Sequence, residues 1–348
     1  MDRDEAREIK GQLADFARDL AERGGAGATA SAAAPAGEGE PAGPVGREAW
    51  APTLALGLAP REGGGYGIAV RYRLGVPAVR SIARRVASEA GPVVDVRRTG
   101  RIRALSRSTG TGPRPPVVTA QAAGETGRVR PLRPGVSIAH VDVTAGTLGA
   151  FVLVGDAVHA LSNYHVLAGS PRAQVGDAVV QPGPADGGRA PADQVGTLAA
   201  TVPLARGRTA TVDAAIALLD DPDVDLDYPV GRITTTAVAL GGETVGKIGR
   251  TTAVTAGRVT AIELDDVVVG YGEDLGALRF DDQIEVESTG TGPFSRGGDS
   301  GSLVYRADGV ALGLLFAGSE TGGENGTGLT YVNPIDTVLA ALDARLAR

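Results

Sequence analysis

Cysteine is absent from this 348-residue sequence, and several other residue types are scarce. Without cysteine the chain can form neither a disulfide bond nor a thiolate metal site. Aromatic residues make up only 4% of the sequence, whereas glycine occurs 52 times, which suits a turn-rich β protein better than a helical bundle. Lysine is nearly absent too, because Lys10 and Lys247 are the only two among 34 basic residues. We interpret the preference for arginine as a compositional bias without functional weight.

Long hydrophobic runs are also missing. No stretch approaches the roughly 18 uninterrupted apolar residues expected of a membrane-spanning helix, and no apolar signal-peptide core follows the charged start Met1–Glu5. The net charge of −7 argues against general nucleic-acid binding. We therefore expect a soluble cytoplasmic protein that binds neither membrane nor nucleic acid. The absence of cysteine is compatible with that compartment.

Residues 1–23 are predicted to form an amphipathic helix that ends at two following glycines. Its apolar residues recur at spacings of four, three and four and so form one stripe. They are Ile9, Leu13, Phe16 and Leu20. The stripe either packs on the rest of the chain or docks to a partner. Residues 24–47, rich in alanine, glycine and proline, are predicted to be a flexible linker.

Residues 48–108 are predicted to form a small α+β domain. The expected elements are strands at 53–58, 66–72 and 92–96 and a helix that begins at Pro77. Nothing in this part resembles a catalytic constellation, so we expect it to recruit, together with the N-terminal helix, a substrate or a regulatory partner. Residues 109–134, rich in proline and glycine, are predicted to be a second linker.

From residue 135 to residue 348, short apolar or alternating segments follow one another between Gly, Pro and Asp turns. The expected strands lie at 136–143, 148–154, 157–162, 195–203, 211–219, 244–248, 257–263, 266–270, 285–288, 302–306 and 310–316. About a dozen short strands in roughly 200 residues indicate an all-β barrel or sandwich. A packed terminal helix is expected to start with Pro334 at its first position.

One short segment between apolar strands, Arg296–Ser302, reads Arg-Gly-Gly-Asp-Ser-Gly-Ser. Flanking glycines let the backbone turn sharply and approach a substrate closely. Ser300 is therefore the candidate nucleophile, and the N–H groups of Gly298 and Ser300 are the candidate oxyanion hole. A serine hydroxyl is a poor nucleophile without a base, and alone such a string is also compatible with a simple turn.

Two further residues complete a candidate triad. His165, in Ser-Asn-Tyr-His-Val, can take up and return a proton near neutral pH. Asp213 heads the apolar run Ala-Ala-Ile-Ala-Leu-Leu, and a partly buried carboxylate needs a partner such as the His165 ring. The other two histidines, His140 and His159, are expected to be non-catalytic strand residues.

Other aspartates keep the choice of Asp213 open. Asp220, Asp221 and Asp223 lie nearby, in the acidic segment 220–227. We expect that segment to be a solvated loop; calcium binding stays an alternative, although the spacing matches no known calcium loop. No cofactor and no metal are predicted.

The order His165, Asp213, Ser300 is the order of the chymotrypsin-type enzymes. Together with the motifs around these residues, it makes residues 135–348 resemble a trypsin/chymotrypsin-like serine protease domain. The segments Thr147–Val152 and Gly249–Thr252 are similar to those of intracellular bacterial and plant trypsin-like proteins.

The resemblance implies a mainly β fold: a trypsin-like double antiparallel β-barrel with a C-terminal helix, preceded by the small α+β unit and the N-terminal helix. It implies that Ser300 attacks a peptide carbonyl, that His165 acts as base and then acid, and that Asp213 holds the imidazole tautomer. It also implies a substrate pocket. The pocket residues would be Phe294 and Ser295 at the base and Phe316, Ala317 and Gly318 along one wall.

Two departures from the family pattern shape the expectations. No acidic residue stands at the pocket base, so we expect a small or apolar side chain, not a strict preference for Arg or Lys. Asp299 has no evident new N-terminal amine to pair with, so we predict another partner, Arg296 or a backbone amide, in a site that forms without processing. The function favoured is a regulated serine endopeptidase acting on a protein or peptide; the alternative is a catalytically silent scaffold that binds one.

Overall fold

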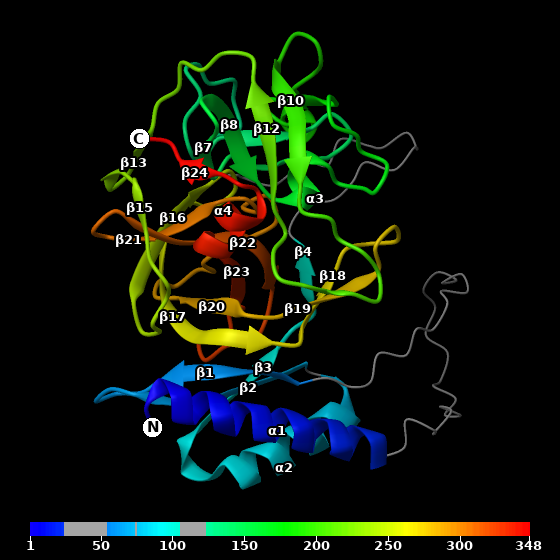
Figure 1. Cartoon of the computed structure of the whole chain (residues 1–348), viewed down its shortest axis with the longest axis vertical. Coiled ribbons are helices and arrows are strands. Elements are labelled where there is room, and N and C mark those ends of the chain that lie inside the picture. The colour runs from blue at the N-terminus through cyan, green and yellow to red at the C-terminus, as the bar shows by residue number, and fades with distance from the viewer. Residues whose placement is uncertain (24–53, 74, 105–122) are drawn as a thin grey trace.

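The computed structural model describes residues 1–23, 54–73, 75–104 and 123–348. It is a mainly β protein in which two barrels lie above an N-terminal unit of helices and strands (Figure 1). The predicted linker 24–47 lies outside the described residues, as does most of the second linker.

The first barrel is built from six antiparallel strands. In their order in the sheet they are β7 (Ala150–Val154), β8 (Ala157–Ser162), β12 (Ala215–Leu219), β10 (Gln194–Thr201), β9 (Ala178–Val180) and β5 (Ser137–His140). Backbone hydrogen bonds join the two ends of this sheet, because Gly135 N–H donates to Leu148 O and Leu148 N–H to Val136 O. Two short strands, β6 (Gly146–Thr147) and β24 (Arg345–Leu346), extend it at its ends.

The second barrel is a closed ring of six strands. Around the ring they are β16 (Thr244–Gly249), β17 (Ala253–Asp265), β20 (Gln283–Ser288), β23 (Thr330–Pro334), β22 (Val310–Ser319) and β21 (Leu303–Arg306), which pairs again with β16. A hairpin, β18 (Val267–Gly270) and β19 (Ala277–Phe280), leaves the end of β17. The predicted double β-barrel is therefore confirmed.

The segment that leads from β12 of the first barrel to β16 of the second contains β13 (Asp227–Tyr228), β14 (Gly231–Arg232) and β15 (Thr235–Thr236). The short strand β11 (Thr209–Ala210) lies between β10 and β12 and pairs in parallel with β19. The terminal helix α4 (Ile335–Ala341) packs with apolar residues of both barrels into one buried cluster. It starts one residue later than predicted: Pro334 ends β23 with an extended ψ of 130° and precedes the helix.

The N-terminal unit consists of two helices over a three-stranded sheet. Its elements are α1 (Arg3–Arg23), β1 (Ala55–Pro60), β2 (Tyr66–Arg73), α2 (Pro77–Ala90), the 3₁₀ turn η1 (Gly91–Val93) and β3 (Val94–Thr99). The third strand was predicted at 92–96 and begins two residues later, because η1 comes first. Pro77 opens α2 as expected.

Helix α1 uses its apolar stripe within the protein. Leu13 is buried, and Ile9, Phe16 and Leu20 pack partly buried against the same cluster as β1 and α2. Burial of one such leucine contributes about 1.5–3 kcal/mol. Of the two readings of the stripe, packing on the chain itself is therefore the one observed.

The N-terminal sheet and the second barrel form one continuous sheet, because β1 pairs antiparallel with β17. Buried ion pairs also join the N-terminal sheet to the second barrel. The Arg71 guanidinium, 1% exposed, donates to the fully buried carboxylate of Glu285 at 2.8 Å, and Arg97 pairs with Glu287. The unit predicted as a small domain thus shares both a sheet and buried ion pairs with the second barrel.

Candidate active site

His165 lies on the single-turn helix α3 (Tyr164–Leu167), which follows β8. The residue is only 5% exposed. Its ring Nδ1 forms a short hydrogen bond with Asp213 Oδ2, and its backbone N–H donates to Asp213 Oδ1 at 3.3 Å. An ionised carboxylate only accepts hydrogen bonds, so this contact keeps the proton on Nδ1 and leaves Nε2 as the basic nitrogen.

Asp213 is fully buried at the entrance to β12. Its backbone N–H donates to Asn333 Oδ1 at 2.9 Å, and Asn163 Nδ2 donates to its carbonyl at 2.7 Å. A buried carboxylate is stable only when hydrogen-bond donors satisfy it. Of the aspartates considered from the sequence, Asp213 is the one that hydrogen-bonds to the His165 ring, as predicted.

Ser300 lies in the turn before β21. Its hydroxyl donates a long hydrogen bond, 3.4 Å, to the carbonyl of Phe316, and its own carbonyl accepts from Thr147 N–H at 2.7 Å. The turn requires glycine on both sides. Gly298 has φ +98° and Gly301 has φ +94°, and a Cβ at Gly301 would stand 2.1 Å from the Ser162 hydroxyl.

The candidate oxyanion hole comes from the same turn. Thr147 Oγ1 donates to Gly298 O at 2.8 Å and thereby fixes the peptide that follows Gly298. Within the described part of the chain, neither the Gly298 nor the Ser300 N–H donates to another protein group. Two unused N–H groups on either side of Asp299 are what an oxyanion site requires.

Asp299, beside the nucleophile, is fully buried and well satisfied. Backbone N–H groups of Arg296, Thr251 and Thr252 donate to its carboxylate at 2.9–3.0 Å. Of the two predicted kinds of partner, backbone amides are therefore the observed one. A further partner, not predicted from the sequence, is Lys247, whose fully buried ammonium lies 3.5 Å from Asp299 Oδ2.

Burial lowers the pKa of Lys247, and the Asp299 charge opposes that shift. The preference for arginine over lysine in the composition gives no indication of this role. A lysine in the middle of a predicted apolar strand, in a chain with only one other, was the available signal. That other lysine, Lys10, also pairs with a carboxylate, Asp265, at 2.7 Å.

The predicted pocket residues are engaged within the protein. Phe294 is 2% exposed and packs in the core cluster of the second barrel, whereas the Ser295 hydroxyl hydrogen-bonds to Thr330 Oγ1 at 2.7 Å. The Phe316 ring packs on Phe280 with centroids 4.8 Å apart. These contacts fix the side chains; their role as a pocket base and wall stays a prediction.

The edge formed by Ala317 and Gly318 is occupied by the chain itself. A three-residue strand, β4 (Ile102–Ala104), pairs antiparallel with β22, so that Gly318 faces Arg103. On its other side β4 pairs in parallel with β18 at Gly270. In Figure 1 it stands between β22 and the β18–β19 hairpin. No sequence signal marked this three-residue strand.

The remaining histidines have structural roles. His140 Nε2 lies 3.1 Å from Asp177 Oδ2, and its Nδ1 accepts from Asp142 N–H. His159 Nδ1 lies 2.9 Å from the carbonyl oxygen of Ala157, two residues earlier in the chain. Neither joins His165, as expected.

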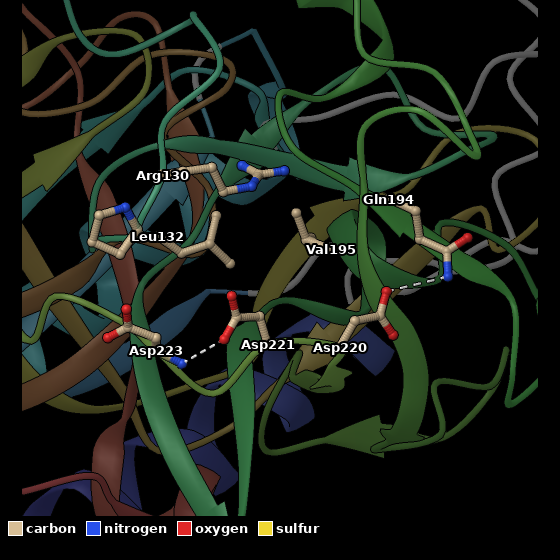
Figure 2. Close-up of a pocket in the computed structure, with 8 residues that line it drawn as sticks. Arg130, Leu132, Gln194, Val195, Asp220, Asp221 and Asp223 are labelled. Carbon is tan, nitrogen blue, oxygen red and sulfur yellow. Dashed lines mark hydrogen bonds between the residues drawn. The ribbon is translucent and has the colours of Figure 1, made fainter.

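The acidic segment lines a separate cleft of about 300 Å³. Figure 2 shows Asp220, Asp221 and Asp223 along it, with Arg130 on the opposite side. Asp220 accepts from Gln194, and Asp221 from the Asp223 N–H. In the described ranges, no group of three or more His, Asp or Glu side chains is arranged to hold a metal ion.

Among the helices of the described residues, none combines the length and the apolar composition that a membrane-spanning helix needs.

Tyr271 is a second residue of the site that was not predicted from the sequence. It follows β18 between two glycines, and its hydroxyl donates to Asp213 Oδ2 at 2.5 Å. Its ring meets the His165 ring edge-on, with centroids 5.8 Å apart. A lone tyrosine in a glycine-rich turn gives no signal in the sequence, because the contact joins positions 58 residues apart.

A scan of the sequence against models of known protein families finds no match, and a search of curated protein sequences finds none either. Solved structures do match. Thermobifida fusca protease A is 19% identical over 62% of this chain and 98% of its own, with a TM-score of 0.44. A glutamic acid specific serine protease, described as using a histidine triad in substrate binding, is 25% identical over 62% of this chain and 100% of its own, at TM-score 0.44. A Cellulomonas bogoriensis chymotrypsin is 20% identical over 62% and 98%, at TM-score 0.42. Each of these three matches covers 62% of this chain and almost the whole of the matched protein.

Proposed function

We propose that this protein is a serine endopeptidase. The observation that supports it most directly is the hydrogen bond between His165 Nδ1 and the buried carboxylate of Asp213, on the barrel that contacts the Gly-Asp-Ser-Gly turn. A buried carboxylate on one imidazole nitrogen leaves the other nitrogen as a base of fixed orientation.

The reaction follows the roles of these groups. Ser300 Oγ attacks the peptide carbonyl while His165 Nε2 takes its proton, and the oxyanion is held by the N–H groups of Gly298 and Ser300. Collapse of the tetrahedral intermediate breaks the C–N bond, and His165 returns the proton to the leaving amine. Water then hydrolyses the acyl-enzyme by the same two steps.

The substrate is proposed to be an extended peptide that adds as a strand to β22. The Phe316 carbonyl of β22 accepts from the Ser300 hydroxyl, and the next three residues, 317–319, form the edge that pairs with β4. Strand addition recognises the peptide backbone, and side-chain pockets supply the preference. We keep the expectation of a small or apolar residue before the cleaved bond.

The strand β4 suggests how the enzyme is regulated, because it already occupies the edge of β22 with which such a peptide would pair. We propose that the enzyme is latent while Ile102–Ala104 stays on β22, and becomes active when this segment leaves. The same observation favours the second candidate function, a silent scaffold whose groove serves only to bind a strand.

Hydrolysis of a peptide library separates the two functions. The wild-type chain, an Arg103→Pro variant designed to release β4, and Arg103→Pro combined with Ser300→Ala are compared. An endopeptidase gives cleavage in the second protein and none in the third. A library left intact by the folded Arg103→Pro variant supports the scaffold, and cleavage dominated by arginine before the bond refutes the proposed preference.

A further inference from the structure

Asp213 Oδ2 receives two donors, and only one of them is the catalytic histidine. The second is the hydroxyl of Tyr271, at 2.5 Å. Oδ1 is held separately by the His165 N–H. The carboxylate therefore cannot rotate without losing a hydrogen bond at one of its two oxygens.

Tyr271 reaches Asp213 from the second barrel, whereas His165 and Asp213 belong to the first. The tyrosine lies between its two aromatic neighbours: it meets the His165 ring edge-on at 85° and stacks on Phe280 at 22°, both with centroids 5.8 Å away. Phe280 in turn contacts Phe316, whose carbonyl accepts from Ser300. One row of rings thus connects the base to the strand beside the nucleophile.

The loop that presents Tyr271 is itself fixed. Tyr271 N–H donates to Gly276 O at 2.7 Å and closes the turn between β18 and β19. From the first barrel's side, Arg206 donates to the carbonyls of Glu273 and Asp274. Fixing the loop from both sides limits how far the hydroxyl can move from the carboxylate.

We propose that Tyr271 is a positioning residue of this site: it holds the Asp213 carboxylate, and through it the His165 ring, in the orientation that catalysis needs. Burial and the neighbouring Asp213 charge raise the pKa of Tyr271 well above its usual value of 10. The hydroxyl therefore remains a donor across the physiological range. The kinetic part of this proposal rests on the proposed endopeptidase function; its structural part does not.

The test is Tyr271→Phe, which keeps the ring and removes the hydroxyl. The matched control is Tyr228→Phe, which removes another buried hydroxyl, bonded to Gly149 O at 2.8 Å and not in contact with His165 or Asp213. Loss of one hydrogen bond to a buried charge and of fixed geometry is expected to lower kcat roughly 10- to 100-fold with KM unchanged. The kinetics are measured in the Arg103→Pro background, and the control is expected to keep its kcat.

A second readout needs no turnover. In ¹⁵N-labelled protein the His165 Nδ1 proton is expected as a far-downfield resonance. Tyr271→Phe moves this resonance and speeds its exchange with water, and Tyr228→Phe leaves it in place.

The outcomes separate the two proposals. An unchanged resonance in Tyr271→Phe overturns the positioning role, and so does an unchanged kcat in an active enzyme. If no variant cleaves any peptide but the resonance still responds to Tyr271→Phe alone, the endopeptidase function fails and the positioning role stands.

Discussion

Release of β4 is the perturbation that best tests the proposal that this strand keeps the site latent. Arg103 is exposed and is the central residue of β4, with Gly318 on one side and Gly270 on the other. Proline at this position has no N–H to donate, and its ring disfavours a place inside a sheet. Arg103→Ala is the matched control, because it removes the same side chain and keeps the N–H.

The magnitude follows from the pairing. A lost ladder hydrogen bond costs about 1 kcal/mol, and an acceptor left without its donor adds a comparable penalty, so the strand is weakened by about 2–3 kcal/mol. A factor of ten corresponds to about 1.4 kcal/mol, so the released fraction rises roughly 30- to 150-fold.

The assay is hydrolysis of a fluorogenic peptide at substrate concentrations far below KM. Arg103→Pro is expected to cleave it faster than wild type by up to this factor, whereas Arg103→Ala stays near the wild-type rate. Equal rates in wild type and Arg103→Pro, with wild type fully active, would refute the role assigned to β4.

Three further predictions concern buried charges. Arg71→Met leaves the Glu285 carboxylate buried without its cation and is expected to lower the free energy of unfolding by about 3–5 kcal/mol, measured by urea denaturation; Arg71→Met with Glu285→Leu should recover much of it, and an undiminished stability of the single variant would contradict the buried pair. Lys247 has a lowered pKa in the folded state, so between that value and 10.5 the unfolded chain binds more protons. The charged Lys247 therefore destabilises the folded state fully below its folded-state pKa, and this destabilisation disappears as the pH rises toward 10.5. The free energy of unfolding of wild type should accordingly increase relative to that of Lys247→Met between these two pH values. A difference between the two proteins that does not depend on pH argues against the buried ammonium. Asp213→Asn is expected to reduce kcat by about 10⁴-fold with KM little changed, because the histidine then loses its preferred tautomer.

The strands of the two barrels could be predicted from the sequence because the patterns that indicate a strand are local. The strand at Ala157–Ser162 was predicted with the observed bounds, and its neighbours lie within a few residues of theirs. Alternation of apolar and polar residues, and the turn residues that bound a strand, can be recognised within a few sequence positions. Asp213 and His165 were identified for a similar reason: each stands in a short motif with its own chemical requirement.

The missed features depend on contacts between distant parts of the chain. The pairing of β1 with β17 and of β4 with β22 joins positions about 200 residues apart, and a strand of three residues has no periodicity to detect. Tyr271 and Lys247 owe their roles to the carboxylates they face. Such roles follow from tertiary packing and are invisible to local patterns.

The central claim is that Ser300 is a nucleophile activated by His165. Its most direct test is covalent labelling by a small fluorophosphonate, mapped by peptide mass spectrometry, on the full chain, on Arg103→Pro and on each with Ser300→Ala. The account predicts one phosphonyl group on Ser300, formed faster in Arg103→Pro than in wild type and absent from both Ser300→Ala proteins. A folded Arg103→Pro protein that stays unlabelled at Ser300, or that is labelled equally after Ser300→Ala, would contradict it.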